Sequence, residues 1–348
     1  MPGFESLINQ ERPIRILTTL LQNGTLPHAL LFTGTAGVGK QAAADALAMA
    51  CNCQGAIPEF HAEDPSGQTP ANSSGSINSI AVNACGVCKS CRKIAAGNHP
   101  DIIRIKPAGH FIKIDQIRSL LQNLAMKPYE ATTRFAILSE AQAMNAAASN
   151  ALLKILEEPP QRSMLILIAD QKSDLLPTIV SRCQHVGFNP IPKEIIAAWL
   201  ENKHGLEQPA ADILAAMDNG SFSKAQMMIK DNWLQHRKWL IDEMIRLSQQ
   251  PIARLLALAE KLSKQEGKLA ESLEIIKVWF RDRIVCQYDD AKIINRDVAD
   301  KFKNASQKNN LTELLSKVDA VQKTQNRLAA NTNLRLTLES LLIKLAQP

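Results

Sequence analysis

Aromatic side chains are scarce in this sequence, since Phe, Trp and Tyr together make up 4% of its 348 residues. Single-stranded nucleic acids usually stack on exposed aromatic rings, so this scarcity argues against such a binding surface. No apolar run approaches the roughly 18 residues that a membrane-spanning helix needs. The start of the chain, MPGFESLINQERPIRIL, has acids and proline where a signal peptide would have an apolar core. We therefore expect a cytoplasmic protein with no membrane partner.

The excess of positive charge is small, with a formal net charge of +6 at pH 7. It permits a partner that carries phosphates but does not require one. No helical stretch stands out as rich in Lys and Arg. The sequence therefore disfavours a zinc-containing protein that binds DNA directly through a basic recognition helix. The hydrophobic fraction of 45% and the charged fraction of 21% are ordinary for a soluble globular protein, and the length suggests two or three domains.

Strand and helix signals alternate in the first half of the chain. Four short apolar runs, each typical of a buried parallel strand, are HALLFTG, DIIRIK, RFAILSE and MLILIAD. Stretches with helical spacing lie between them, such as IKIDQIRSLLQNLAM and NAAASNALLKILEEPP. This alternation predicts an α/β domain with a parallel sheet over residues 1–189.

The strand signal ends after about Pro190. Two short helical patterns follow within 190–231, and amphipathic helical patterns succeed one another from 232 to 348. We therefore predict a small helical domain and then an all-α domain. The segment 54–84 departs from the α/β pattern because it has five Ser, three each of Gly, Asn and Pro, and no Lys or Arg. That composition predicts a flexible insertion.

The stretch GTAGVGKQ, residues 34–41, is close to the phosphate-binding pattern G-x-x-x-x-G-K-[ST]. It lies between a predicted strand and a predicted helix, where the helix N-terminus favours an anion. Gly34, Gly37 and Gly39 would let backbone N–H groups turn toward the phosphates, and Lys40 would contact the β- and γ-phosphates. The sequence therefore predicts a P-loop fold.

Two groups that would hold Mg²⁺ are missing around this loop. Gln41 stands where a hydroxyl residue should follow Lys40, and Ser139 stands where an Asp is expected at the end of a second strand. Glu140 could orient a water molecule, but without a metal ion the charge of the γ-phosphate would stay unneutralised. We predict weak binding of ATP or ADP and little or no hydrolysis.

Three of the seven cysteines form the spacing C-x₂-C-x₂-C at Cys85, Cys88 and Cys91. Such a cluster suits tetrahedral Zn²⁺ in a reducing compartment and is unusual for cysteines that are simply buried. A fourth ligand must come from elsewhere. Cys53, at the end of the predicted P-loop helix, is favoured, and the alternatives are Cys51, His61 and His99. We predict a structural zinc site rather than a catalytic one.

Several motifs taken together resemble one family. They are HALLFTGTAGVGK, the three-cysteine group, NHPD at 98–101, SNALLKILEEPP and SRC at 181–183. In this order they resemble bacterial clamp-loader subunits of the AAA+ class. Within that class the match is to the delta-prime group of DNA polymerase III, and the alternative is an active ATPase of the gamma/tau type.

This resemblance implies a role in DNA replication. Such a subunit joins gamma/tau and delta subunits in a pentameric ring that opens the sliding clamp and places it on primed DNA. It would be a non-motor component of a DNA polymerase holoenzyme, without independent catalysis. The implied fold is an AAA+ P-loop domain with an inserted zinc module (53–91), followed by a helical lid (190–231) and an all-α collar for oligomerisation (232–348).

The resemblance also implies roles for individual residues. Arg182 of SRC, which from the residues alone is a surface charge near the edge of the sheet domain, matches an arginine finger that acts on ATP bound by a neighbouring subunit. Cys53 matches the fourth zinc ligand. Lys224, in NGSFSKAQ, is the nearest match to a basic sensing residue of the small domain. The insertion is longer than the family's usual connection between the first two cysteines.

Overall fold

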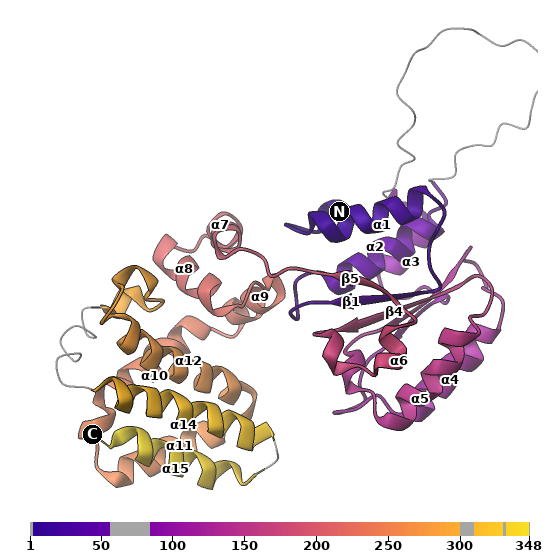
Figure 1. Cartoon of the computed structure of the whole chain (residues 1–348). Coiled ribbons are helices and arrows are strands. Elements are labelled where there is room, and N and C mark those ends of the chain that lie inside the picture. The colour runs from indigo at the N-terminus through magenta and orange to yellow at the C-terminus, as the bar shows by residue number, and fades with distance from the viewer. Residues whose placement is uncertain (1–2, 56–83, 300–309, 330–331, 348) are drawn as a thin grey trace, which may run out of the picture. The chain divides into compact units, whose positions relative to one another are not determined.

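The computed structural model describes residues 3–55, 84–299, 310–329 and 332–347. The chain divides into two compact units, which are described separately here (Figure 1). The first comprises Met1–Pro192 with Gly220–Phe222, and the second comprises Lys193–Asn219 with Ser223–Pro348. Most of the predicted insertion, including His61, lies outside the described residues.

A five-stranded parallel sheet forms the centre of the first unit, with the strand order β2-β3-β4-β1-β5. The strands are β1 (Ala29–Thr33), β2 (Ile102–Ile105), β3 (Arg134–Leu138), β4 (Ser163–Ala169) and β5 (Gln184–Gly187). The first four are the predicted strands, and the predicted α/β architecture is confirmed. Strand β5 was not among the predicted strands, because its four residues QHVG include a single large apolar side chain, Val186.

Alternate residues of each strand face opposite cores, as the two-residue period of a strand requires. Leu30 and Phe32 of β1 belong to one core and Ala29 and Leu31 to the other. Helices cover both faces of the sheet (Figure 1). The first core is covered by α1 (Glu11–Gln22), α2 (Lys40–Asn52) and α3 (Lys89–Ala95), and the second by α4 (Ile114–Ala125), α5 (Ala146–Glu157) and α6 (Pro177–Val180).

The described part of the second unit is all helical, as predicted for the second half of the chain. Its α-helices are α7 (Lys193–His204), α8 (Gln208–Met217), α9 (Phe222–Lys230), α10 (Trp233–Arg246), α11 (Ile252–Ser263), α12 (Glu266–Val285), α14 (Leu311–Ala329) and α15 (Leu334–Ala346). Helix α7 packs on α8, while α10, α11 and α14 pack on α12. The boundary between a lid at 190–231 and a collar at 232–348 stays a prediction.

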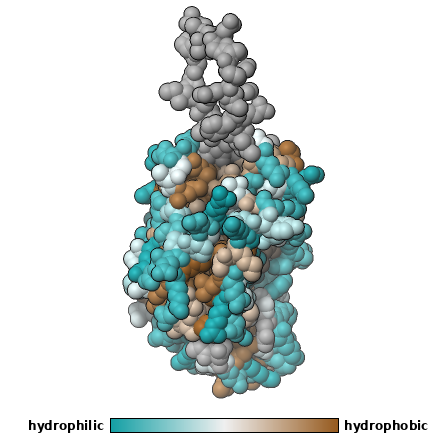
Figure 2. Space-filling model, turned by 90° about the vertical axis from the view of Figure 1, so that its right-hand side faces the viewer, coloured by the Kyte–Doolittle hydropathy of each residue, from teal (hydrophilic) through white to brown (hydrophobic). Residues whose placement is uncertain are grey.

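Neither the described helices nor the surface face in Figure 2 carries a long continuous apolar region. Among the described helices, none combines the length and the apolar character needed to cross a bilayer. Figure 2 shows one face of the molecule, on which hydrophilic side chains predominate and hydrophobic ones form small separate patches.

Candidate functional site

The phosphate loop joins β1 to α2 and has the backbone that the three glycines predict. Gly34, Gly37 and Gly39 have φ angles of 142°, 81° and 105°, which L side chains rarely adopt. A Cβ atom at Gly34 would lie 2.5 Å from the carbonyl oxygen of Phe188. Because that oxygen belongs to the backbone, only glycine fits there. Helix α2 then begins at Lys40, so its N-terminus opens toward the loop.

The Lys40 ammonium group is already engaged by acceptors of its own chain. It donates hydrogen bonds to the carbonyl oxygens of Gly34 and, at 3.3 Å, Thr35. It also pairs with the Asp170 carboxylate at 3.2 Å, where the Lys40 side chain is 5% exposed and that of Asp170 49%. Burial lowers the pKa of Lys40, and the contact with Asp170 partly offsets this effect. A phosphate entering the loop would therefore compete with a carboxylate for this lysine.

The two altered magnesium positions lie next to each other. The Ser139 hydroxyl donates a hydrogen bond of 2.8 Å to the side-chain oxygen of Gln41. The Gln41 amide nitrogen donates in turn to Asp45 at 3.4 Å. Glu140 follows β3 with a left-handed backbone (φ 53°) and an exposed side chain. The positions inferred from the sequence are thus brought together, but their polar groups are bonded to each other.

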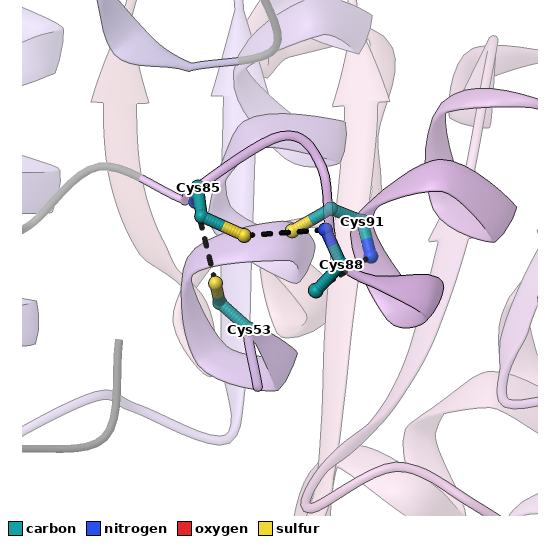
Figure 3. Close-up of side chains that lie close together, drawn as sticks. All are labelled: Cys53, Cys85, Cys88 and Cys91. Atoms are coloured by element: carbon teal, nitrogen blue, oxygen red, sulfur yellow. Dashed lines mark hydrogen bonds between the residues drawn. The ribbon is translucent and has the colours of Figure 1, made fainter. Parts of the chain in front are cut away.

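Four cysteines cluster at the opposite end of α2 (Figure 3). Cys53 directly follows α2, Cys85 and Cys88 precede α3, and Cys91 lies in the first turn of α3. The four sulfur atoms all lie within 4.8 Å of one another. Four thiolates around Zn²⁺, with Zn–S near 2.3 Å, would have their sulfur atoms about 3.8 Å apart, so the cluster fits such an ion after a small contraction.

Backbone N–H groups point at the cysteine sulfurs. Cys85 N donates to Cys53 Sγ at 3.3 Å, and Cys88 N and Cys91 N donate to the sulfurs of Cys85 and Cys88 at 3.4 Å. Although burial acts to raise the pKa of Cys88, hydrogen bonds from the backbone of Cys91 and Gln54 and from neighbouring thiols lower it to about 6. Cys88 therefore favours thiolate, the form that binds metals, whereas burial raises the pKa of Cys91.

The ends of the insertion meet at this cluster. A Cβ atom at Gly55 would lie 3.2 Å from Cys85 Sγ, which places the chain leaving α2 directly beside the chain returning to α3. The cluster therefore closes the base of the segment 54–84.

Of the other candidates for the fourth ligand, Cys51 and His99 do not join the cluster, and His61 lies outside the described residues. Burial raises the pKa of the Cys51 thiol to about 12, and this side chain packs against the core beneath α2. The imidazole of His99 is buried, and its Nδ1 accepts a hydrogen bond of 3.2 Å from the N–H of Asp101. Within the described part of the chain, Cys53 is the residue that completes the set of four.

Arg182 lies on the surface of the first unit, just after α6. Its side chain is 38% exposed and forms a 2.9 Å ion pair with Glu157, the last residue of α5. It also donates a hydrogen bond of 3.1 Å to the Thr178 carbonyl oxygen. The adjacent Cys183 is partly buried, and burial raises its pKa to about 12. Arg182 is thus accessible to a partner and held by two neighbours.

Lys224 caps a helix in the second unit. Its Nζ donates a hydrogen bond of 2.8 Å to the carbonyl oxygen of Met217, the last residue of α8. Carbonyls at a helix C-terminus lack intrahelical partners and carry partial negative charge, so a lysine is favourable there. This contact gives Lys224 a structural role, and its sensing role stays a prediction.

Sequence reasoning missed two carboxylates that the structure emphasises. Asp170, at the carboxyl end of β4, was recognised as the end of a strand but not as the partner of Lys40. Asp101 of the NHPD motif is fully buried and accepts hydrogen bonds from the backbone N–H groups of Tyr129, Glu130 and Ala131 and from the Arg134 side chain. Burial acts to raise its pKa, but these donors hold it at about 2. The sequence did offer a signal for both residues, because Asp170 directly follows β4 and Asp101 directly precedes β2.

Two family descriptions together match most of the chain. The one described as "DNA polymerase III, delta subunit" matches residues 9–68 and 71–192, and "DNA polymerase III, delta subunit, C terminal" matches residues 231–347. Among solved structures, a DNA polymerase III gamma subunit-related protein from Thermotoga maritima is similar with a TM-score of 0.48 and 19% identity, covering 95% of this chain and 98% of that chain.

Two curated relatives, both named delta', match nearly the full length of this chain. DNA polymerase III subunit delta' of Bacillus subtilis is 28% identical, covering 97% of this chain and 96% of the relative. The delta' subunit of Pseudomonas aeruginosa is 31% identical and covers 92% of each chain. DNA polymerase III subunit tau of Escherichia coli is 31% identical, but the alignment covers 64% of this chain and 32% of tau. The chain therefore belongs to the delta-prime family of DNA polymerase III clamp-loader subunits.

Proposed function

We propose that this chain is a non-motor member of its clamp loader, with a degenerate ATP site of its own and an arginine finger for a neighbour's ATP. The observation that carries the proposal is the hydrogen bond between Ser139 and Gln41. In P-loop ATPases a loop Ser or Thr and an Asp at this strand end hold Mg²⁺. Here the corresponding side chains, Gln41 and Ser139, are hydrogen-bonded to each other. The loop position lacks the hydroxyl and the strand-end position lacks the carboxylate that would hold the ion.

Lys40 supports the same conclusion from the other side of the loop. A P-loop lysine stabilises the β- and γ-phosphates through its positive charge. In this chain that charge already faces Asp170 at 3.2 Å and two backbone carbonyl oxygens. The glycine loop and the α2 N-terminus keep some affinity for an anion. We therefore propose weak binding of ATP or ADP at most, without appreciable hydrolysis.

The catalytic contribution of this chain is proposed to come from Arg182. Its guanidinium group is exposed on the first unit and follows the short helix α6. An arginine finger acts by stabilising the charge that develops on the transferred phosphoryl group, and it must reach a site on another chain. Lys224 is proposed as a basic sensing residue, a role that would require its contact with Met217 to open.

The four cysteines are proposed to hold structural Zn²⁺. A set of four protein thiolates leaves no open coordination position for a substrate, which is the pattern of structural rather than catalytic zinc. The ion would tie the C-terminal end of α2 to the start of α3 through Cys53, Cys85, Cys88 and Cys91. This chain contributes the backbone N–H groups that stabilise thiolate at the cluster.

The proposed partners are gamma/tau and delta subunits in a pentameric ring, the sliding clamp, and primed DNA through the assembled complex. They are inferred from relatives named as DNA polymerase III subunits delta' and tau. A replication protein with a cluster of unpaired thiols fits the cytoplasm, where thiols stay reduced.

Reconstitution tests this proposal. The purified chain is mixed with gamma/tau and delta subunits of the same organism, and assembly, ATPase turnover and clamp loading are measured. We expect a stable complex with ATPase and loading activity, and no magnesium-dependent turnover from this chain alone. Failure to join the complex would refute the clamp-loader role. An ordinary ATPase rate from the isolated chain would favour the alternative, an active ATPase of the gamma/tau type.

A further inference from the structure

The side chain of Arg182 is held from two directions by its own unit. One terminal nitrogen, Nη2, lies 2.9 Å from the Glu157 carboxylate, and the other, Nη1, donates to the Thr178 carbonyl oxygen at 3.1 Å. Glu157 belongs to α5 and Thr178 to α6, so two separate helices fix the plane of the guanidinium group. Neither contact was evident in the sequence, where 24 positions separate Glu157 from Arg182.

The position of Glu157 makes it a firm support. It is the last residue of α5, and Pro159 and Pro160 follow almost at once and prevent the helix from continuing. The main chain that carries the carboxylate is therefore restricted. By contrast, an isolated arginine side chain on a surface has several rotatable bonds and loses rotamer freedom when it is fixed.

The pair contributes little to the stability of the unit itself. The side chains of Arg182 and Glu157 are 38% and 53% exposed, and exposed ion pairs usually contribute little to the free energy of unfolding. A guanidinium group has five N–H donors, and these two contacts leave others available. The pair instead orients the exposed guanidinium group of Arg182. Because the pair is weak, the guanidinium group can shift toward a phosphate at a small cost in free energy.

We propose that Glu157 is a positioning residue for Arg182, orienting the guanidinium group before a neighbour's ATP is engaged. The proposal rests on the proposed role of Arg182 as an arginine finger. Pre-organisation of a charged group lowers the cost of placing it in the transition state and therefore raises kcat. Since Glu157 does not touch the nucleotide in this scheme, the KM for ATP should not depend on it.

The test uses the reconstituted loader with gamma/tau, delta, sliding clamp and primed DNA, and measures kcat and KM for ATP. Glu157→Gln removes the charge and keeps the size of the side chain, and we expect kcat to fall about two- to five-fold with KM unchanged. Glu157→Asp should recover part of the loss. The difference from wild type should shrink as salt is raised, because salt screens exposed charges.

Glu158→Gln is the matched control. Glu158 is the next residue, is also exposed, and forms no ion pair with the described residues, so kcat should equal that of wild type. In the Arg182→Ala background, Glu157→Gln should have no further effect. The thermal unfolding midpoint and the assembly of the Glu157→Gln complex should match those of wild type.

The outcomes separate the two proposals. If Arg182→Ala leaves turnover unchanged, the arginine finger fails, and the positioning role fails with it. If Arg182→Ala lowers turnover and Glu157→Gln does not, only the positioning role is overturned. It is equally overturned if Glu157→Gln lowers kcat in the Arg182→Ala background, raises kcat, or prevents assembly.

Discussion

Helix α2 has a different kind of site at each end. At its N-terminus the phosphate loop keeps its backbone, yet Gln41 and Ser139 hold each other and Lys40 is paired with Asp170. At its C-terminus the four cysteine sulfurs lie within 4.8 Å of one another as a complete set. A loop backbone can persist after the side chains of a reaction are gone, whereas a metal cluster that stabilises the fold needs every ligand. The two ends of α2 thus distinguish residues that keep the fold, such as the loop glycines and the cysteines, from side chains that a reaction would need.

The largest effect should follow from removing one cysteine of the cluster at the C-terminal end of α2. Cys91→Ser should abolish stoichiometric zinc binding and lower the thermal unfolding midpoint by about 10 °C, because loss of a structural metal costs several kcal/mol. Metal analysis and thermal unfolding measure the two effects. Cys51→Ala is the control, since Cys51 lies outside the cluster. Full zinc content in Cys91→Ser would contradict the four-cysteine site.

A second experiment tests whether Arg182 supplies the catalytic contribution proposed for this chain. Arg182→Ala should reduce hydrolysis at the neighbouring ATP site by about 10³-fold, the lower range for an arginine finger. Total ATPase of the loader should fall by that site's share, while assembly stays intact. ATPase assays on the reconstituted complex and size-exclusion chromatography measure these effects. Unchanged turnover would place the catalytic contribution elsewhere.

A third experiment restores the two residue types expected to hold Mg²⁺ at the phosphate loop. Gln41→Thr combined with Ser139→Asp restores a hydroxyl and a carboxylate and removes the hydrogen bond between positions 41 and 139. We expect ADP to bind the isolated chain about tenfold more tightly with Mg²⁺ than without it, by isothermal titration calorimetry. Gln41→Asn, which keeps an amide, should not gain this dependence. If magnesium has no effect on the double variant, loss of these two ligands does not explain the degenerate site.

The smallest effect concerns the partner of Lys40. Asp170→Asn removes the negative charge 3.2 Å from the ammonium group. ADP should then bind about two- to five-fold more tightly in equilibrium dialysis, because the contact is half-exposed and partly screened. Asp174→Asn serves as the control, since Asp174 lies in the same loop but bonds to the N–H of Gln171. Weaker ADP binding by Asp170→Asn would show that Asp170 supports the loop rather than competing with phosphate.

Local patterns predicted most of the fold, the phosphate loop and the cysteine cluster, whereas the roles of Arg182 and Lys224 came from the family resemblance. Apolar runs located β1 to β4, the glycines located the loop, and the place of Cys53 at the end of the predicted P-loop helix favoured it over its alternatives. Strand β5 escaped because QHVG has too few apolar residues to show a period. The long-range partners of Gln41, Lys40 and Arg182 also escaped; they are Ser139, Asp170 and Glu157. Side-chain pairing across such separations depends on tertiary packing that periodicity does not encode.

Because Gly55 lies beside Cys85, the segment between them is a suitable place to insert additional residues. When the two ends of a segment are already held together, its length affects stability only through chain-closure entropy, at about 0.6 kcal/mol per doubling. We therefore expect that an affinity tag inserted between Gly55 and Ala84 leaves β1 and the phosphate loop undisturbed, because the cysteine cluster already brings the two ends side by side. The cluster thus marks a place where the chain can be labelled.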